Sequence, residues 1–221
     1  VSRELELTLT GKSCGTEERA PMCGVPFHSA ETYIARLVKK GYTVVVCEQM
    51  EDPATAKGLV KRDVVRIITP GTVTESVMLT EGKNNYLCAL YISGTCAGIC
   101  FADISTAKVY VTQINDGDVN NRIINELATY LPSEIITNAD RTGVKEIFEY
   151  ARDRIGSVYN DASKNLFSGD AYGELCTHFG KDQLDKALLY ENSPGTRALC
   201  AIMRYIAQTQ KVDLAYIDKI N

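Results

Sequence analysis

A chain of 221 residues is long enough for one large domain or two modest ones. Hydrophobic residues make up 45% of it and charged residues 24%, as in ordinary soluble globular proteins, and no apolar run approaches the roughly 20 residues that a membrane-spanning helix needs. The net charge of −4 argues against a strongly basic nucleic-acid binder. Residues 1–71 hold 10 Lys and Arg against 9 Asp and Glu, whereas residues 72–221 hold 14 against 19, so a DNA contact is expected in the first third.

The first third predicts a small mixed α/β domain. The alternation of polar and apolar residues from Glu4 to Leu9 predicts a strand, and the Gly, Pro, Thr and Ser content of residues 11–27 predicts a loop. A helix is expected next, with Ser29 as its N-cap, an apolar face at helical spacing, and Gly41 at its end. The chain starts inside the alternating stretch and without Met, which predicts a fragment whose first domain is incomplete.

Two further strands complete this first unit. Thr43 to Cys47 is rich in β-branched residues and predicts a short buried strand. Residues 51–62 form a polar connection, and Val64 to Ile68 predicts another strand that ends at the turn sequence Thr69-Pro70-Gly71. A boundary is expected at residues 73–84, where no periodicity is strong.

The remaining residues predict three strands in a meander and then helices that alternate with strands. The three strands are Tyr86–Ile92, Ala97–Ile104 and Lys108–Ile114, joined by connections short enough for hairpins. The later elements are a helix capped by Asp118 and stopped by Pro132, a strand Glu134–Thr137, a helix at 142–150, a strand at 157–159, helices at 170–179 and 182–190, and a long apolar helix that starts at Ser193-Pro194. This order predicts a mixed sheet flanked by helices, as in ribonuclease H-like folds.

One stretch of the chain resembles a known protein family. Pro21-Met22-Cys23-Gly24-Val25-Pro26-Phe27-His28, then Cys47-Glu48-Gln49, Asp52-Pro53-Ala54-Thr55 and the run from Val64 to Thr72 follow bacterial MutS DNA mismatch-repair proteins in order and spacing. Asp103-Ile104-Ser105 and Ser193-Pro194-Gly195 resemble the connector domain of that family more loosely. Ala107 departs from the family, which often carries Gly at that turn.

The resemblance implies a division into three parts. Residues 1–72 would be the C-terminal part of a mismatch-recognition domain, residues 73–84 a linker, and residues 85–221 a ribonuclease H-like connector that runs into the first helices of the lever and core. The connector would relay between the DNA-binding and ATPase regions and offer a docking surface for a MutL-type protein. The parent proteins are dimeric, bind double-stranded DNA, and bind ATP and Mg²⁺ in a region that this chain lacks, so no cofactor and no catalysis are expected here.

The resemblance also implies weak DNA binding without mismatch discrimination. The family reads the lesion with a Phe-x-Glu motif, which does not occur in these 221 residues. Lys57, Lys61 and Arg62, in the polar connection, and Arg66, in the following strand, are the candidates for contacts with the DNA backbone, because cations neutralise phosphates without reading sequence. The alternative is a solvated basic loop, balanced by nearby acids.

Asp103 is the centre of a rival hypothesis, a metal-dependent ribonuclease H-like nuclease. Such enzymes hold two metal ions with converging carboxylates. Asp103 ends the second strand of the predicted meander, and Glu126 and Asp140 are the other acids considered. A turn-capping role, with the carboxylate bonded to backbone amides, is the interpretation that we favour. A third reading, a protein-interaction module without DNA contact, predicts no salt-dependent DNA affinity.

Two other motifs do not predict a nucleotide-binding or metal-binding site. Gly11-Lys12-Ser13 lacks the earlier glycine of a phosphate-binding loop, because that position is Glu6, so no nucleotide site is expected. Cys96 and Cys100 lie four apart without a second pair or nearby histidines, which favours packing over a metal site. Eight cysteines in partly apolar runs and the lack of a signal peptide predict a reduced, cytoplasmic protein with no membrane contact.

Overall fold

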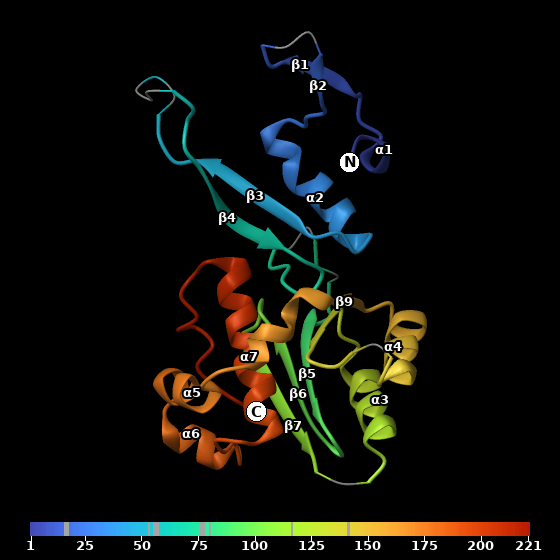
Figure 1. Ribbon diagram of the computed structural model, residues 1–221, viewed down its shortest axis with the longest axis vertical. Helices are drawn as coiled ribbons and strands as arrows, with labels where there is room; N and C mark the ends of the chain where they lie inside the picture. The colour runs from blue at the N-terminus through green and yellow to red at the C-terminus, as the bar shows by residue number, and fades with distance from the viewer. Residues whose placement is uncertain are drawn as a thin grey trace.

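The structure is a computed structural model, and it describes residues 1–15, 18–52, 54, 58–75, 78–79, 81–115, 117–140 and 142–221, with the side chains of 161–163 left aside. Two parts follow one another along the long axis of the molecule (Figure 1). As far as it is described, the N-terminal part, blue to teal, holds two hairpins, two α-helices and a 3₁₀ helix at Phe27–Ser29. The second part, green to red, holds one five-stranded sheet between two layers of helices.

The N-terminal part differs from expectation in its first 27 residues. The predicted strand Glu4–Leu9 is wrong, because a single helical turn, α1 (Ser2–Leu5), ends at Glu6 in the left-handed conformation with φ 56°. The loop predicted for 11–27 is wrong in part, because β1 (Thr10–Ser13) and β2 (Arg19–Met22) pair as an antiparallel hairpin. Nearly all of this hairpin is exposed, so no buried face imposes an alternating pattern on its sequence.

The predicted helix and the two strands after it are confirmed in position. They are α2 (Ala30–Lys39), β3 (Val44–Gln49) and β4 (Arg62–Ile68). The strand expected to be buried at Thr43 to Cys47 is mostly exposed, however, and the Ser29 hydroxyl donates to the Pro26 carbonyl oxygen instead of capping the helix. The two strands form an antiparallel hairpin with an irregularity between Val46 and Cys47. Their core is small. Among the residues that the structure describes, its buried members are Val38, Ile68 and Val73. The opposite side of the hairpin leaves Val45 and Val65 exposed.

The second part contains the predicted mixed sheet flanked by helices. Its strands are β5 (Tyr86–Ser93), β6 (Cys96–Asp103), β7 (Lys108–Ile114), β8 (Glu134–Thr137) and β9 (Val158–Asn160). They lie in the order β7-β6-β5-β8-β9. The first three are antiparallel, so the predicted meander is confirmed, and β8 and β9 run parallel to β5.

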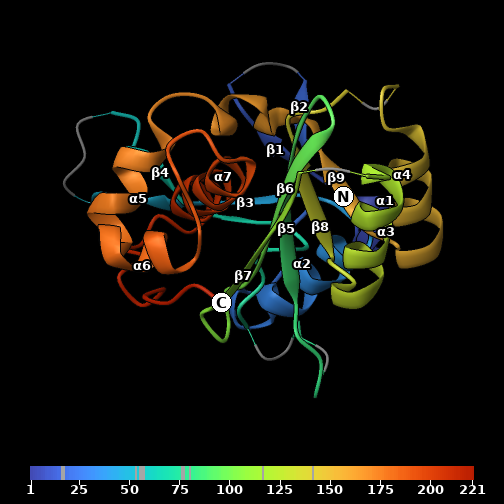
Figure 2. The same cartoon turned by 90° about the horizontal axis from the view of Figure 1, so that it is seen from below.

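Each face of the sheet is covered by its own helices, and Figure 2 shows the sheet between the two layers. One layer holds α3 (Val119–Tyr130) and α4 (Lys145–Tyr150), followed by a π-helical turn at Ala151–Ile155. The other layer holds a 3₁₀ helix (Asp161–Phe167), α5 (Ala171–Phe179), α6 (Lys181–Lys186) and α7 (Pro194–Gln210). Alternate residues of β5 enter the two cores. Leu87 and Ala89 face α7, whereas Cys88 and Leu90 face α3.

The predicted start of α7 is confirmed in atomic detail. The Ser193 side chain accepts a hydrogen bond from the Thr196 amide, and Pro194 occupies the first turn, where a missing N–H costs nothing. The helix is buried along most of its length because it crosses the central strands β5 and β6. Asp118 caps α3 in the same way, by accepting from the Asn121 amide.

Ala107, in the turn between β6 and β7, has a strained backbone conformation. Its φ of 56° lies in the left-handed region, which costs an L-residue about 1–2 kcal/mol. Ala107→Gly is therefore expected to raise the free energy of unfolding by about 0.5 kcal/mol, since the relieved strain outweighs the lost methyl group and the added chain entropy. Urea denaturation measures this difference. Thr106→Gly, at a neighbouring position outside that region, should instead lower stability.

Candidate nucleic-acid interface and interdomain junction

The β3–β4 hairpin is the element that presents the predicted basic residues. Its base, where Val44 pairs with Ile68, lies against the second part of the molecule, and its strands run outward to the pair Gln49 and Arg62 (Figure 1). Only the base is packed, because the buried contacts with α2 involve the inner ends of both strands. The outer end of the hairpin is therefore a projecting arm whose side chains are open to solvent.

Two of the four predicted cations stand on this arm. Lys61 and Arg62 are both exposed. The Lys61 amide donates to the Glu51 carboxylate at 2.6 Å, and the Arg62 guanidinium donates to the Val60 carbonyl oxygen at 3.3 Å. The first of these bonds uses the backbone, so the Lys61 ammonium group is available to an anion. Lys57 lies outside the described residues.

Arg66 has a different environment from Lys61 and Arg62. Its guanidinium forms an ion pair with Glu75 and donates to the Thr74 hydroxyl at 3.4 Å. Burial alone would raise the pKa of Glu75, but the hydrogen bond and charge of Arg66, together with hydrogen bonds from the Glu75 and Thr74 backbone, outweigh burial and lower that pKa below its usual value of 4.5. Arg66 thus fastens β4 to the segment that follows the hairpin.

The turn-capping interpretation of Asp103 is confirmed. Its carboxylate accepts from the Ser105 amide at 3.0 Å, from the Ser105 hydroxyl at 2.6 Å and from the Asn85 amide at 3.3 Å. These bonds close the β6–β7 turn and attach the start of β5 to it. Across the described ranges, no group of three or more His, Cys, Asp and Glu side chains is arranged to hold a metal ion, so nothing supports the nuclease hypothesis.

Glu134 is the residue that the sequence reading missed. It opens β8 and is only 1% exposed, although it carries a carboxylate. The Thr69 hydroxyl and the Gly71 amide donate to its Oε2, the latter at 2.9 Å. The Tyr205 hydroxyl at 2.5 Å and the Asn160 amide nitrogen at 3.4 Å donate to its Oε1. A lone acid at the head of an otherwise apolar strand was the available signal.

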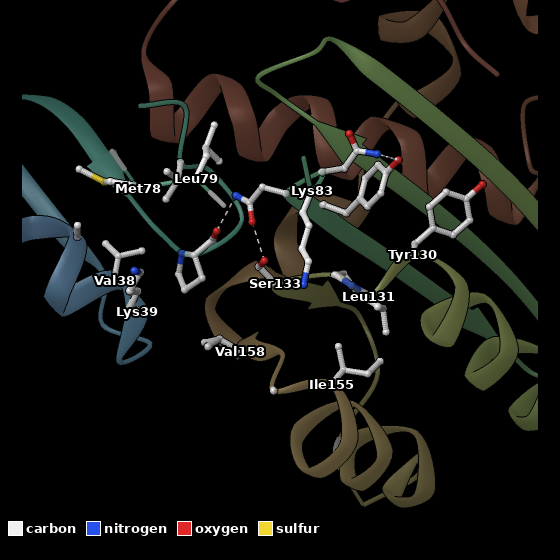
Figure 3. Close-up of a pocket in the computed structure, with 18 residues that line it drawn as sticks. Val38, Lys39, Met78, Leu79, Lys83, Tyr130, Leu131, Ser133, Ile155 and Val158 are labelled. Carbon is white, nitrogen blue, oxygen red and sulfur yellow. Dashed lines mark hydrogen bonds between the residues drawn. The ribbon is translucent and has the colours of Figure 1, made fainter. Parts of the chain in front are cut away.

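A second polar bridge lies beside Glu134. Asn85 donates to the Pro70 carbonyl oxygen at 2.9 Å and accepts from the Ser133 hydroxyl at 2.6 Å. Next to this bridge lies a cavity of about 600 Å³, lined by α2, by the segment after β4 and by the loop before β8 (Figure 3). Val38 and Lys39 line it from one side and Leu131 and Ile155 from the other. The junction is thus polar at its centre and hollow at its edge.

Comparison with known proteins identifies the two parts. Residues 1–77 match the family model described as MutS domain I, and residues 85–218 match the model described as MutS domain II. The chain belongs to the MutS family. MutS domain I therefore occupies the N-terminal region of this chain and contains the β3–β4 hairpin, whereas MutS domain II contains the five-stranded sheet. The bonds from Thr69 and Gly71 to Glu134 join the two domains.

The relatives are named DNA mismatch repair protein MutS. The one from Ruminiclostridium cellulolyticum is 48% identical over 222 residues, those from Acetivibrio thermocellus and Clostridioides difficile are 46% and 44% identical over 224 residues, and each alignment covers 100% of this chain. The chain spans 25%, 25% and 22% of these relatives, about a quarter of a MutS protein. Among the described residues, no helix is both long and apolar enough to cross a membrane.

Proposed function

We propose that this chain is the non-catalytic, DNA-facing and connecting part of a MutS-type repair protein. Residues 1–72 serve as a partial mismatch-recognition domain, 73–84 as a linker, and 85–221 as the connector that leads toward the lever and core. The connector relays between the DNA-binding and ATPase regions and offers a docking surface for a MutL-type protein. ATP and Mg²⁺ are bound elsewhere in the parent protein, which is dimeric and cytoplasmic.

The observation that carries the DNA-binding part of this proposal is the projecting hairpin arm. Lys61 and Arg62 are exposed at its outer end, in the only third of the sequence whose charge is not acidic. Lys57 belongs to the same connection, and Arg66 follows in β4. Because Arg66 is paired with Glu75, we propose that it supports the arm and that Lys61 and Arg62 meet the phosphates first. Binding of this kind is independent of base sequence.

Fluorescence anisotropy of labelled 20–30-mer duplexes tests this proposal. One duplex is fully paired and the other contains a G·T mismatch, and both are titrated with the chain at several salt concentrations. We expect a dissociation constant on the order of 10⁻⁴–10⁻⁶ M, equal for the two duplexes. In the Lys61→Ala/Arg62→Ala variant, the slope of log affinity against log salt should become shallower by about 1 for each cation removed.

The matched control removes two exposed lysines from the connector. Lys181→Ala/Lys186→Ala, on α6, changes the net charge equally and should leave the salt slope unchanged. Equal losses in both double variants would mean that overall charge drives binding and not the arm. A mismatch preference of about tenfold, or ~1.4 kcal/mol, would contradict the proposal that this chain does not discriminate. A chain with no salt-dependent affinity would instead be a protein-interaction module.

A further inference from the structure

The hydrogen bonds to Glu134 come from three separate segments. Thr69 and Gly71 belong to the turn that directly follows β4, Asn160 ends β9, and Tyr205 lies on α7. A buried carboxylate is stable only when hydrogen bonds replace its lost water, and a carboxylate accepts about four of them. Glu134 is therefore the single acceptor at which the base of the hairpin arm, the sheet and the long helix meet.

The turn that binds Glu134 is itself held by its own side chains. The Thr69 amide donates to the Thr72 hydroxyl at 2.9 Å, and the Thr69 and Thr72 hydroxyls also lie 2.9 Å apart. Gly71 is necessary for the close approach, because a Cβ there would lie 2.8 Å from the Glu134 Cβ. Displacement of this turn is consequently transmitted to Ile68 and the base of β4.

A second bond connects the same turn to the same helix. The Gln210 side chain, in the last turn of α7, donates to the Thr72 carbonyl oxygen at 3.1 Å. Tyr205, one turn earlier, donates to Glu134 and accepts from Asn160 at 2.9 Å. Burial raises the pKa of Tyr205, so its hydroxyl keeps its proton and stays a donor. The end of α7 and the base of the arm thus share one polar cluster.

We propose that Glu134 is a positioning residue that sets the orientation of the β3–β4 arm and couples it to helix α7. The inference rests on the proposed function, since it assigns to named atoms the relay between the DNA-contacting arm and the connector. Both domains bias this cluster. Domain I does so through Thr69 and Gly71, and the connector does so through Tyr205. A shift of α7 changes the Tyr205 bond and thereby the support of the arm.

Hydrogen exchange of the 221-residue chain, followed by mass spectrometry, provides the test. Glutamine has the size of glutamate but places N–H groups opposite existing donors, so Glu134→Gln loses bonds on one side of the cluster. We expect amide exchange of residues 62–72 to accelerate about tenfold or more, while β5 and β6 keep their protection. Tyr205→Phe, a milder change on α7, should accelerate exchange in the same segment. Gly71→Ala, which changes the turn after β4, should also accelerate it.

The control is Glu146→Gln, an identical substitution at an exposed position on α4, which should change nothing. The same variants are titrated with duplex DNA, where Glu134→Gln and Tyr205→Phe should weaken salt-sensitive binding about threefold through loss of arm order. Unchanged exchange at 62–72 in both variants, or equal acceleration throughout the sheet, would overturn the proposed coupling. If the variants accelerate exchange at residues 62–72 as expected but the chain binds no DNA, the inference about the arm's orientation stands and the proposed DNA-binding function is rejected.

Discussion

Gly98→Ala should be strongly destabilising, because the new methyl group would overlap with backbone atoms. Gly98 lies in β6 beneath the start of α7, and a Cβ at this position would lie 2.0 Å from the Pro194 carbonyl oxygen and 2.5 Å from the Gly195 nitrogen. Both are backbone atoms, so a rotamer change cannot relieve the clash. The helix must move away from the sheet, which we expect to lower the free energy of unfolding by about 3 kcal/mol or more.

Urea denaturation followed by circular dichroism measures this loss. Gly143→Ala is the matched control, because its new Cβ would meet only the Asp140 carbonyl oxygen, at an ordinary contact distance of 3.7 Å. That variant should stay within about 0.5 kcal/mol of the parent protein. A loss in Gly98→Ala no larger than the loss in Gly143→Ala would mean that α7 does not sit on β6 as closely as the structure indicates.

The second large effect concerns the aromatic cluster on the other face of the sheet. Phe101 is 0% exposed and stacks on Tyr130, with ring centroids 4.1 Å apart and planes 13° apart. Tyr86 meets it edge-on at 6.3 Å. Phe101→Ala removes this packing and leaves a cavity beneath α3, so we expect the free energy of unfolding to fall by about 4 kcal/mol.

We expect a lower urea midpoint with an unchanged m-value, the slope of the unfolding free energy against urea concentration, because unfolding still exposes the same surface. Phe27→Ala serves as the comparison, since Phe27 is 90% exposed and its loss should cost less than about 0.5 kcal/mol. If Phe101→Ala were as mild as Phe27→Ala, the face of the sheet that packs against α3 would be incorrectly assigned.

The sequence predicts buried helices and strands more accurately than exposed ones. Strands β5 to β8, helix α3 and the start of α7 are predicted within a residue or two, because their apolar residues must face a core and so keep a strict period. The first hairpin and α1 carry no such constraint. The side chains of the hairpin are mostly exposed, and Leu5 is the one buried residue between Glu4 and Leu9, so the alternation there has no continuous buried face behind it.

In the candidate site, local features are predictable from the sequence and long-range contacts are not. Lys61 and Arg62 were predictable from residue type and family resemblance, because a basic loop is a local feature of the sequence. The role of Glu134 was not, since Thr69 lies 65 residues before it and Tyr205 lies 71 residues after it. Contacts of that separation leave no periodic signal. The pairing of Arg66 with Glu75 was hidden for another reason, because Arg66 lies in β4 and Glu75 in the irregular segment after it, where no periodic pattern indicates which side chains meet.

The small core of the arm has a consequence for how the protein is made. In the part of the first domain that the structure describes, the cluster of Val38, Ile68 and Val73 is small and gives that domain little stability of its own, and its polar anchor, Glu134, follows the whole domain in the sequence. A ribosome adds about 5–20 residues per second, so the arm emerges seconds before its anchor and longer still before Tyr205. The arm can therefore take its final orientation only after Glu134 and Tyr205 have been synthesised.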